Sequence, residues 1–223
     1  MFGGIGLAHQ TVAGRTAPDL NSLSTSNSRM DDSTASRLLA FLRRAESLKD
    51  ETRTAWTSNG RPESVAAHTW RLCLWAVLLG DHFEERDETF DTQRLLKLCV
   101  VHDLGEALAG DVPAVDQPPE GTSEQERADL QAITAVLPEA GRMQIRDLWE
   151  EYEAAETPEA RVAKALDKLE TLLQHVQGDN PPDFDYRFNL SYGTDYTSDV
   201  DPLVTELRRI LDAETEQRAQ DEG

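Results

Sequence analysis

Apolar residues recur along this chain at intervals of three and four positions, a spacing that predicts helices. In the first such segment, Ser33 is the expected N-cap, and Leu38, Phe41 and Leu42 share one face. Segments 64–80 and 92–109 are apolar on most faces, which is typical of helices inside a core. Further helices are expected over residues 123–137, 139–155, 158–177 and from 202 onward. Clear alternating strand patterns are missing, so the sequence predicts an all-α bundle of roughly seven helices.

Several expected helix ends carry specific capping signals. Ser123 and Glu126 have the spacing of a capping box, and Thr157 before Pro158 is a good cap and first-turn pair. Gly178 is expected to end the helix that Pro158 opens, and Asp201 precedes Pro202 at the start of the last helix. These signals divide the chain into separate helices of ordinary length.

The helical pattern defines one domain over residues 32–214. Residues 1–31 are rich in Ser, Thr, Gly and Asn without apolar periodicity, so we expect a disordered tail. Residues 215–223 are polar, and we expect a short frayed tail there. Residues 50–63 and 110–122 have the composition of loops. The aromatic residues within 179–199 suit a pocket wall, a dimer contact or a small satellite core, and the satellite core is slightly favoured.

Charge and cysteine content narrow the class of protein. The formal charge of −20 disfavours binding to nucleic acid, although a metal and an arginine can still attract a small anion. Cys73 and Cys99 lie in apolar runs, so we expect reduced core residues in a cytoplasmic protein. No apolar run has the length of a membrane span, and the N-terminus makes a poor signal peptide.

Two of the five histidines occupy the most apolar segments. His68 and His102 each need a partner for their ring nitrogens if they are buried, and a metal ion is one such partner. An ordinary hydrogen-bonded core histidine explains either residue taken alone. His82 lies about 21 Å further along its helix than His68, and His175 is explained by the dipole at a helix C-terminus. His9 lies in the tail, so the histidines favour one metal rather than two.

Two aspartates complete a possible ligand set. Asp103 follows His102 directly, and Asp167 lies at the edge of the apolar face of a later helix. Two imidazoles and two carboxylates suit a divalent transition ion. For Asp167 alone, an ion pair is the simpler explanation, with Arg161, Lys164 or Lys168 as the partner. The four residues taken together, His68, His102, Asp103 and Asp167, predict a metal centre.

Glu106 is the candidate proton shuttle beside that centre. It follows His102 by four residues and Asp103 by three, so on a continuous helix the three residues share a face. This position suits a general acid or base acting on water at a metal. A solvated glutamate near a helix end is the ordinary alternative. Asp111 is either a polar wall of the same site or a turn residue.

Three ordered segments carry a resemblance to a known family. ESVAAHTWRL, VVHDLGEALAGDVPA and KALDKLE resemble the H…HD…D signature of the HD-domain superfamily. The residues around these motifs resemble those of the HD-domain 5′-deoxynucleotidases of bacteria and eukaryotes. The resemblance extends from about Arg37 to Leu211. RTAW, at 53–56, is similar to the RTGW of the eukaryotic type. The resemblance implies an HD-domain helical bundle that hydrolyses phosphomonoesters.

The resemblance also implies roles for particular residues. It assigns His68, His102, Asp103 and Asp167 to the metal and Glu106 to catalysis. Arg53 is placed at the substrate phosphate, where a guanidinium can make a bidentate contact. Asp111 is placed near the substrate sugar or a bound water. The family is typically a cytoplasmic homodimer that favours Co, Mn or Cu, while the ligand set itself suits one divalent ion such as Mn, Co, Ni, Fe or Zn.

One departure from the family pattern bears on substrate choice. The bacterial type has an Arg-Trp pair whose tryptophan helps to exclude ribonucleotides, whereas Thr54 follows Arg53 here and the aromatic residue is Trp56. A substrate-binding role for Trp56 leaves the preference for 2′-deoxy sugars open. The alternatives are therefore a phosphohydrolase for another small phosphorylated compound or a nucleotide-binding module without catalysis. An iron oxygenase on this fold would need more ligands than the histidines supply.

Overall fold

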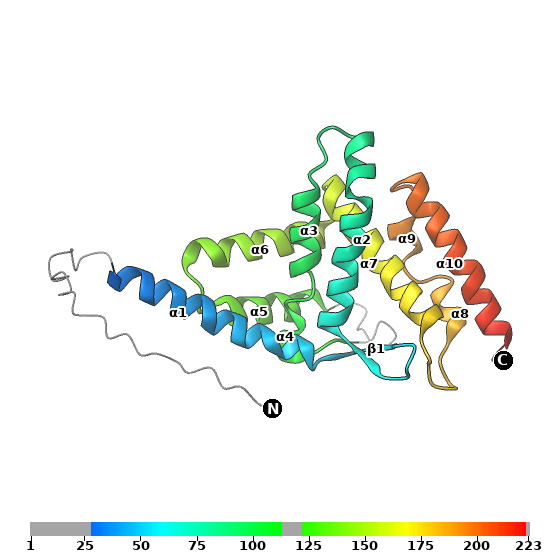
Figure 1. Ribbon diagram of the computed structural model, residues 1–223, viewed down its shortest axis with the longest axis horizontal. Coiled ribbons are helices and arrows are strands. Elements are labelled where there is room, and N and C mark those ends of the chain that lie inside the picture. Colours follow the sequence, from blue (N-terminus) through cyan, green and yellow to red (C-terminus); the bar gives the residue numbers. More distant parts are fainter. Residues whose placement is uncertain (1–27, 113–121, 222–223) are drawn as a thin grey trace, which may run out of the picture.

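The protein folds as a helical bundle in which the C-terminal helices, coloured yellow to red, pack on one side and the earlier helices, coloured blue to green, on the other (Figure 1). The computed structural model describes residues 28–112 and 122–221. Seven helices in this part of the chain have ten residues or more: α1 (Ser28–Ala45), α2 (Val65–Arg86), α3 (Thr92–Val101), α5 (Ser123–Thr134), α6 (Glu139–Ala154), α7 (Pro158–Gln177) and α10 (Pro202–Asp221). The prediction of an all-α bundle of roughly seven helices is confirmed.

Shorter helical turns connect these elements: η1 (Glu46–Lys49), α4 (Glu106–Ala109), α8 (Tyr186–Asn189) and α9 (Thr194–Thr197). Helix α7 is central, because it contacts α2, α3 and α6 on one side and α9 and α10 on the other. Its residues Leu166, Leu169 and Leu172 are completely buried. Burial of one such leucine contributes roughly 2–3 kcal/mol, so α7 fixes the positions of its neighbours.

A two-stranded antiparallel sheet occupies part of the segment that the sequence analysis assigned to a loop. Strand β1 (Thr52–Trp56) pairs with β2 (Pro62–Ser64), and Thr52 lies opposite Ser64. In β1, Arg53 and Ala55 face inward, whereas Thr52 and Thr54 are exposed. A charged residue at an inward position conceals the alternation of hydrophobicity, so the strand could not be found from apolar periodicity.

The helix expected over 92–109 is interrupted at its most important point. Helix α3 ends at Val101, and the chain then turns through residues 102–105 before α4 begins. Within this turn, the amides of Leu104 and Glu106 donate to the carbonyls of Val101 and Asp103, a three-residue spacing tighter than an α-helix. Gly105 allows the close approach of α5, because a Cβ atom there would lie 2.8 Å from the Glu126 carbonyl oxygen.

Gly178 ends α7 as predicted, and of the four predicted N-caps two are confirmed and two are wrong. Thr157 Oγ1 accepts from the amide of Ala160, and Asp201 Oδ1 accepts from that of Leu203. Ser33 lies inside α1 rather than at its start, because α1 begins at Ser28. The capping box at Ser123 does not form, since α5 has Thr122 as its N-cap and the Ser123 hydroxyl donates to Glu153. A tertiary partner therefore competes successfully with the local one.

The packed region reaches beyond the expected C-terminal boundary. Helix α10 continues to Asp221 and buries Thr215, whose hydroxyl donates to the Leu211 carbonyl.

Most of the N-terminal segment expected to be disordered, residues 1–27, lies outside the described residues. Cys73 and Cys99 are free, as predicted. None of the helices in 28–112 and 122–221 combines the length and apolar character needed to cross a bilayer.

Candidate functional site

Four side chains from separate parts of the chain meet inside the bundle. His68 comes from α2, His102 and Asp103 from the turn after α3, and Asp167 from α7. Nε2 of His68 lies 3.1 Å from Oδ1 of Asp167, and Nε2 of His102 lies 3.0 Å from Oδ2 of Asp103. The remaining distances between these imidazoles and carboxylates are 3.9 and 4.0 Å. The predicted set is thus brought together around one centre.

Both imidazoles are oriented by contacts at their other nitrogen. Nδ1 of His68 lies 2.5 Å from Oε2 of Glu170, and Nδ1 of His102 lies 2.9 Å from the Cys99 carbonyl oxygen. Nε2 of each ring consequently faces the centre, buried, with a carboxylate oxygen at 3.1 Å from His68 and 3.0 Å from His102 but no well-aligned hydrogen bond among the described residues. Buried ring nitrogens are costly to leave unpaired, and two of them beside two carboxylates fit a divalent cation.

Asp167 is held so that one oxygen remains directed at the imidazoles. Its Oδ2 accepts hydrogen bonds of 2.9 Å from the Tyr152 hydroxyl and from the Lys168 ammonium group. Its Oδ1 faces His68 and His102. The ion pair with Lys168, which the sequence offered as an alternative to a metal-ligand role, therefore occupies one oxygen and leaves the other for the centre.

Opposite charges dominate the electrostatics of the site. Burial alone would raise the pKa of Asp103, but His102, Arg53 and His68 lower it to about 2. Burial acts in the same direction on Asp167, yet Lys168 and His68 hold its pKa well below the usual range. Burial and Arg53 oppose protonation of His68, whereas Glu170 and Asp167 raise its pKa to about 9. The same carboxylates favour any cation at this centre.

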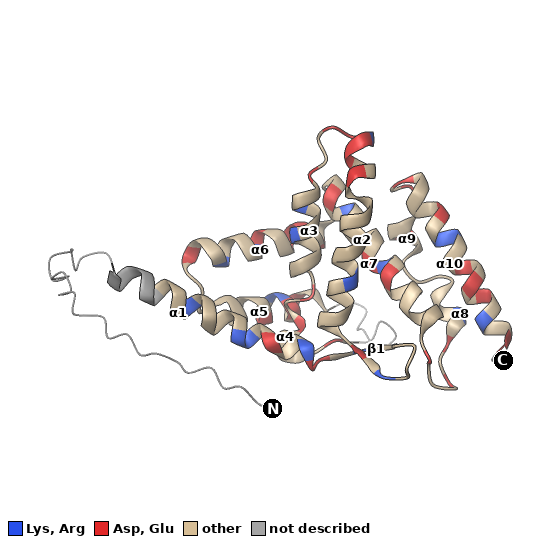
Figure 2. Ribbon diagram, in the orientation of Figure 1, with Lys and Arg blue, Asp and Glu red and all other residues tan. Residues whose placement is uncertain are grey.

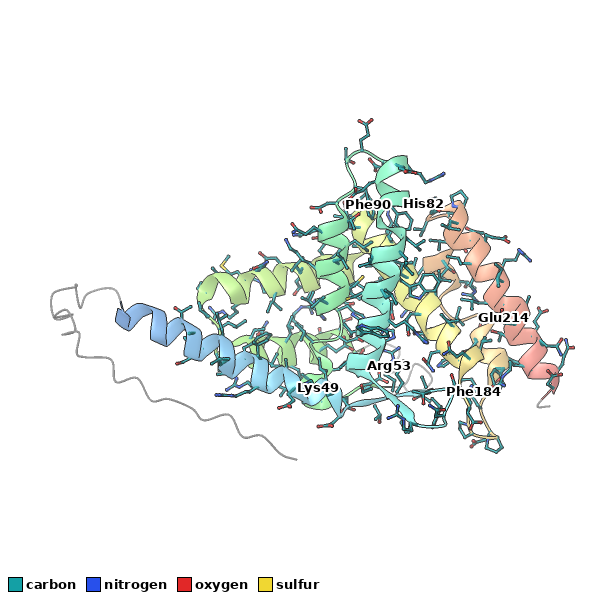
Figure 3. All side chains as sticks on the ribbon, in the orientation of Figure 1. Lys49, Arg53, His82, Phe90, Phe184 and Glu214 are labelled. Carbon is teal, nitrogen blue, oxygen red and sulfur yellow. The ribbon has the colours of Figure 1, made fainter. Side chains whose placement is uncertain are left out.

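Arg53 closes one side of the centre. Its Nη1 lies 3.4 Å from Oδ2 of Asp103, and its Nη2 donates to Oγ1 of Thr171 at 3.1 Å. Burial opposes the charge of Arg53, but Asp103, Asp167 and Asp111 raise its pKa above the usual value. The guanidinium therefore stays charged at the point where the centre meets the neighbouring cavity. Figure 3 labels Arg53 at the lower edge of the bundle.

Glu106 and Asp111 complete the acidic side of the site. Because the turn at 102–105 intervenes, Glu106 does not share one continuous helical face with His102 and Asp103. Burial and repulsion from Asp103 and Asp111 nevertheless raise the pKa of Glu106 to about 10. Its Oε2 is buried and has no hydrogen-bond partner among the described residues. Burial also raises the pKa of Asp111.

A cavity of about 360 Å³ opens beside Arg53. Trp56, Phe184, Phe188 and Tyr192 supply aromatic walls, and Asp111 also lines the space. The rings of Trp56 and Phe184 meet edge to face at 6.1 Å. Rings from the 179–199 segment therefore form a pocket wall, not only the satellite core that the sequence analysis favoured. The volume is that of a small-molecule site.

His175 differs from its expected role at a helix C-terminus. It lies in the last turn of α7, but burial lowers its pKa to about 4, so the ring is neutral and cannot complement the helix dipole as a cation. It lines the cavity instead. Asp167, Thr171 and His175 follow each other at steps of four, a periodicity that could have linked the metal centre to the cavity from the sequence.

Other residues of the site were not singled out from the sequence. Glu170 orients His68, Tyr152 orients Asp167 together with Lys168, which the sequence had offered only as an ion-pair partner, and Asn189 lies in the cavity wall. Glu170 follows Asp167 by three residues, so it shares the inward face of α7. Tyr152 and Asn189 come from elements whose packing on α7 no local pattern reveals.

A buried pair of imidazoles and a pair of carboxylates at the centre of an all-α bundle define the HD-domain class of metal-binding hydrolases. A family model described as an HD domain matches residues 45–206, and the chain belongs to this family.

Relatives of known name agree with this assignment. The chain is 37% identical over 143 residues to the 5′-deoxynucleotidase HDDC2 of Homo sapiens, covering 63% of this chain and 67% of that protein. It is 32% identical over 185 residues to the Mus musculus protein of the same name, covering 82% and 89%. A crystal structure of a predicted metal-dependent phosphohydrolase from Magnetospirillum magnetotacticum superposes with a TM-score of 0.74 at 27% identity, covering 85% of this chain and 96% of that one.

Proposed function

We propose that this protein is a metal-dependent phosphohydrolase that releases phosphate from deoxynucleoside 5′-monophosphates. The observation that carries this proposal is the convergence of the buried Nε2 atoms of His68 and His102 on the carboxylates of Asp103 and Asp167 next to Arg53. The adjoining cavity has aromatic walls that suit a nucleoside. The names of the eukaryotic relatives support the same reaction and substrate class.

The metal ligands in this proposal are His68, His102, Asp103 and Asp167. Imidazole nitrogen and carboxylate oxygen bind several divalent ions, so Mn, Co, Ni, Fe, Zn and Cu all suit the set. The hydrogen bond from Nδ1 of His68 to Glu170 would fix the ring and increase the basicity of Nε2. A divalent ion supplies activation of water and neutralisation of phosphate charge.

The remaining groups position the substrate and move a proton. Arg53, charged and partly held by Thr171, binds the phosphate oxygens. Burial and the neighbouring carboxylates raise the pKa of Glu106 in the metal-free protein, and Glu106 passes a proton to the departing sugar oxygen and takes one from the attacking water. Asp111 and Trp56 contact the sugar side of the substrate. Water attacks phosphorus directly, so the chain needs no nucleophilic side chain.

A phosphate-release screen tests this function directly. Deoxy- and ribonucleoside monophosphates are each assayed with Mn, Co, Ni, Zn and Mg, and deoxynucleotides are expected to release phosphate fastest. Asp103→Ala is expected to lose both metal content and activity. Glu106→Gln is expected to keep metal content but lose turnover by roughly 10²–10⁴-fold. His82→Gln is a matched control, because His82 pairs with Asp201 far from the centre.

The same screen separates the alternatives. Phosphate release from another phosphorylated compound, with none from nucleotides, would replace the substrate class but keep the hydrolase. Nucleotide binding with metal present and no phosphate release would leave a binding module. Normal turnover by Glu106→Gln would remove that residue from the mechanism.

We further propose that the protein forms a homodimer through α2. Trp70, Leu74, Val77 and Leu78 are exposed at intervals of four, three and one, so they form one stripe. Figure 2 shows that most charged residues of α2 lie towards its C-terminal end, leaving this stripe apolar. Two copies of such a stripe can pack on each other around a twofold axis.

The free cysteines support a cytoplasmic location for this protein, and the charge of −20 supports the absence of affinity for nucleic acid.

A further inference from the structure

Helix α7 runs from the proposed metal centre to the far end of the cavity and sets the spacing between the residues that line this path. Asp167, Thr171 and His175 are four residues apart, so each step advances about 6 Å along the helix axis. Asp167 lies at the centre, Thr171 contacts Arg53, and His175 lines the cavity about 12 Å from Asp167. A nucleotide with its phosphate at Arg53 has its base at the His175 end.

Asn189 forms the polar part of the wall at that end. Its side chain is 1% exposed and lies in the cavity lining. The nearer of its two amide heavy atoms is 3.1 Å from Nδ1 of His175. The other amide heavy atom is buried with no hydrogen-bond partner among the described residues. An unpaired amide group at this place costs free energy unless a bound molecule satisfies it.

The hydrogen bonds of His175 decide which amide atom is free. Its Nε2 lies 3.2 Å from the Thr54 carbonyl oxygen, which can only accept. Because burial keeps the ring neutral, with a pKa of about 4, the single ring hydrogen belongs on Nε2. Nδ1 then accepts a hydrogen bond, and Asn189 must turn its NH₂ group towards it. The carbonyl oxygen of Asn189 is consequently the free atom.

Buried contacts hold Asn189 in this position. The Arg208 guanidinium donates to the backbone carbonyls of Asn189 and Leu190 at 3.1 Å and to that of Tyr192 at 2.7 Å. Arg208 is itself buried. Phe188 and Tyr192 come from the same segment and supply part of the aromatic wall. Asn189 is thus held in the cavity lining beside these two aromatic rings.

We propose that Asn189 reads the nucleobase by accepting a hydrogen bond from an exocyclic amino group. This inference rests on the proposed nucleotidase function and extends it to a preference among bases. Bases that carry an amino group there are favoured over bases that present a carbonyl oxygen at the same position. A carbonyl oxygen would face the Asn189 oxygen, and two acceptors would be buried without a shared hydrogen.

Two matched substrate pairs test the preference in the unaltered protein. Deoxycytidine and deoxyuridine monophosphates differ at one ring position, amino against carbonyl, as do deoxyadenosine and deoxyinosine monophosphates. In each pair the amino compound is expected to have the higher kcat/KM, by roughly three- to tenfold. Equal values, or a preference for the carbonyl compounds, would overturn the proposal. Failure to hydrolyse any nucleotide would instead overturn the proposed function.

Substitution of Asn189 tests whether that residue is responsible. In Asn189→Leu, which has a similar volume and no hydrogen-bonding group, the ratio within each pair is expected to fall to about one. Ser191→Ala is the control, because the Ser191 hydroxyl donates to the exposed side of the same segment, at the Phe188 carbonyl. A ratio that survives in Asn189→Leu would assign the preference to another residue.

Discussion

His68 uses its two ring nitrogens for different purposes. Nδ1 contacts Glu170, which also accepts from the Arg71 guanidinium at 2.6 Å, while Nε2 faces the centre. Glu170 has no exposed surface, so its charge is balanced entirely by neighbouring side chains. A metal-binding histidine depends on such a partner for its orientation and basicity. Glu170 is therefore a positioning residue for the proposed metal.

Substituting Glu170 by Gln is expected to weaken metal binding by roughly 10–100-fold, because a neutral amide holds the His68 ring less firmly. Isothermal titration with Mn or Co measures the dissociation constant directly. Glu159→Gln is the matched control, since Glu159 is another buried glutamate of α7 but accepts from the amide of Asp91, away from the centre. Equal affinity in the two variants would contradict the role of Glu170.

His175 is expected to make folding stability depend on pH. Its pKa falls from 6.5 in the unfolded chain to about 4 in the folded one, so the unfolded chain binds more protons between these values. Stability is then complete above about pH 6.5 and is lost as the pH falls towards 4. The contribution is roughly 3 kcal/mol. Denaturant unfolding at several pH values, with chelator present, measures the free energy of unfolding. This free energy should depend less steeply on pH in His175→Gln than in the unaltered protein. Parallel curves for the two proteins would contradict this assignment.

At the scale of elements, the turn after α3 does more than connect two helices. Its tight hydrogen bonds bring His102 and Asp103 onto the same side, where Nε2 and Oδ2 lie 3.0 Å apart. Helix α5 then packs against this turn through Gly105. The geometry of the centre therefore depends on a glycine that contributes no side chain to it.

Gly105→Ala is expected to destabilise the protein by about 1–3 kcal/mol, because its Cβ would lie 2.8 Å from a backbone oxygen. Gly141→Ala is the control, since a Cβ atom there meets nothing nearer than 3.9 Å. Alanine in that helix should stabilise the protein by roughly 0.5 kcal/mol. Thermal and urea unfolding measure both effects, and changes of the same sign would contradict the packing argument.

At the scale of the whole molecule, the excess of negative charge leaves few surfaces where two copies can approach without repulsion. Acidic residues outnumber basic ones by 42 to 22, and Figure 2 shows them on most helices. The apolar stripe of α2 avoids this repulsion, and Trp70 within it is 67% exposed. Exposed apolar residues that are contiguous mark an interaction surface more often than scattered ones do.

Introducing charge into the stripe is expected to separate the proposed dimer. Trp70→Glu combined with Val77→Glu should give a monomer by light scattering at concentrations where the unaltered protein is dimeric, because two carboxylates would be buried opposite their copies. Ile210→Glu, at an exposed position of α10, should remain dimeric. A dimer that persists in the double variant would place the interface elsewhere.

The sequence determined the helical class, most helix positions and the four residues of the centre. Apolar periodicity is a property of the chain itself, since it follows from the repeat of the helix, and the caps at Thr157 and Asp201 act within a few residues. His68, His102, Asp103 and Asp167 could be selected because charged or polar side chains on apolar faces need partners. Their meeting at one point had to come from the resemblance or the fold.

Tertiary structure alone decided the strand that carries Arg53, the turn that aligns His102 with Asp103, and the cavity wall. Each depends on contacts between residues distant in the chain, such as Thr54 with His175 and Gly105 with Glu126. Local periodicity reports which face of an element is buried but not what lies against it. The partners of Glu170 and Asn189 are set by how whole helices pack, and packing is fixed only when the complete core closes around them.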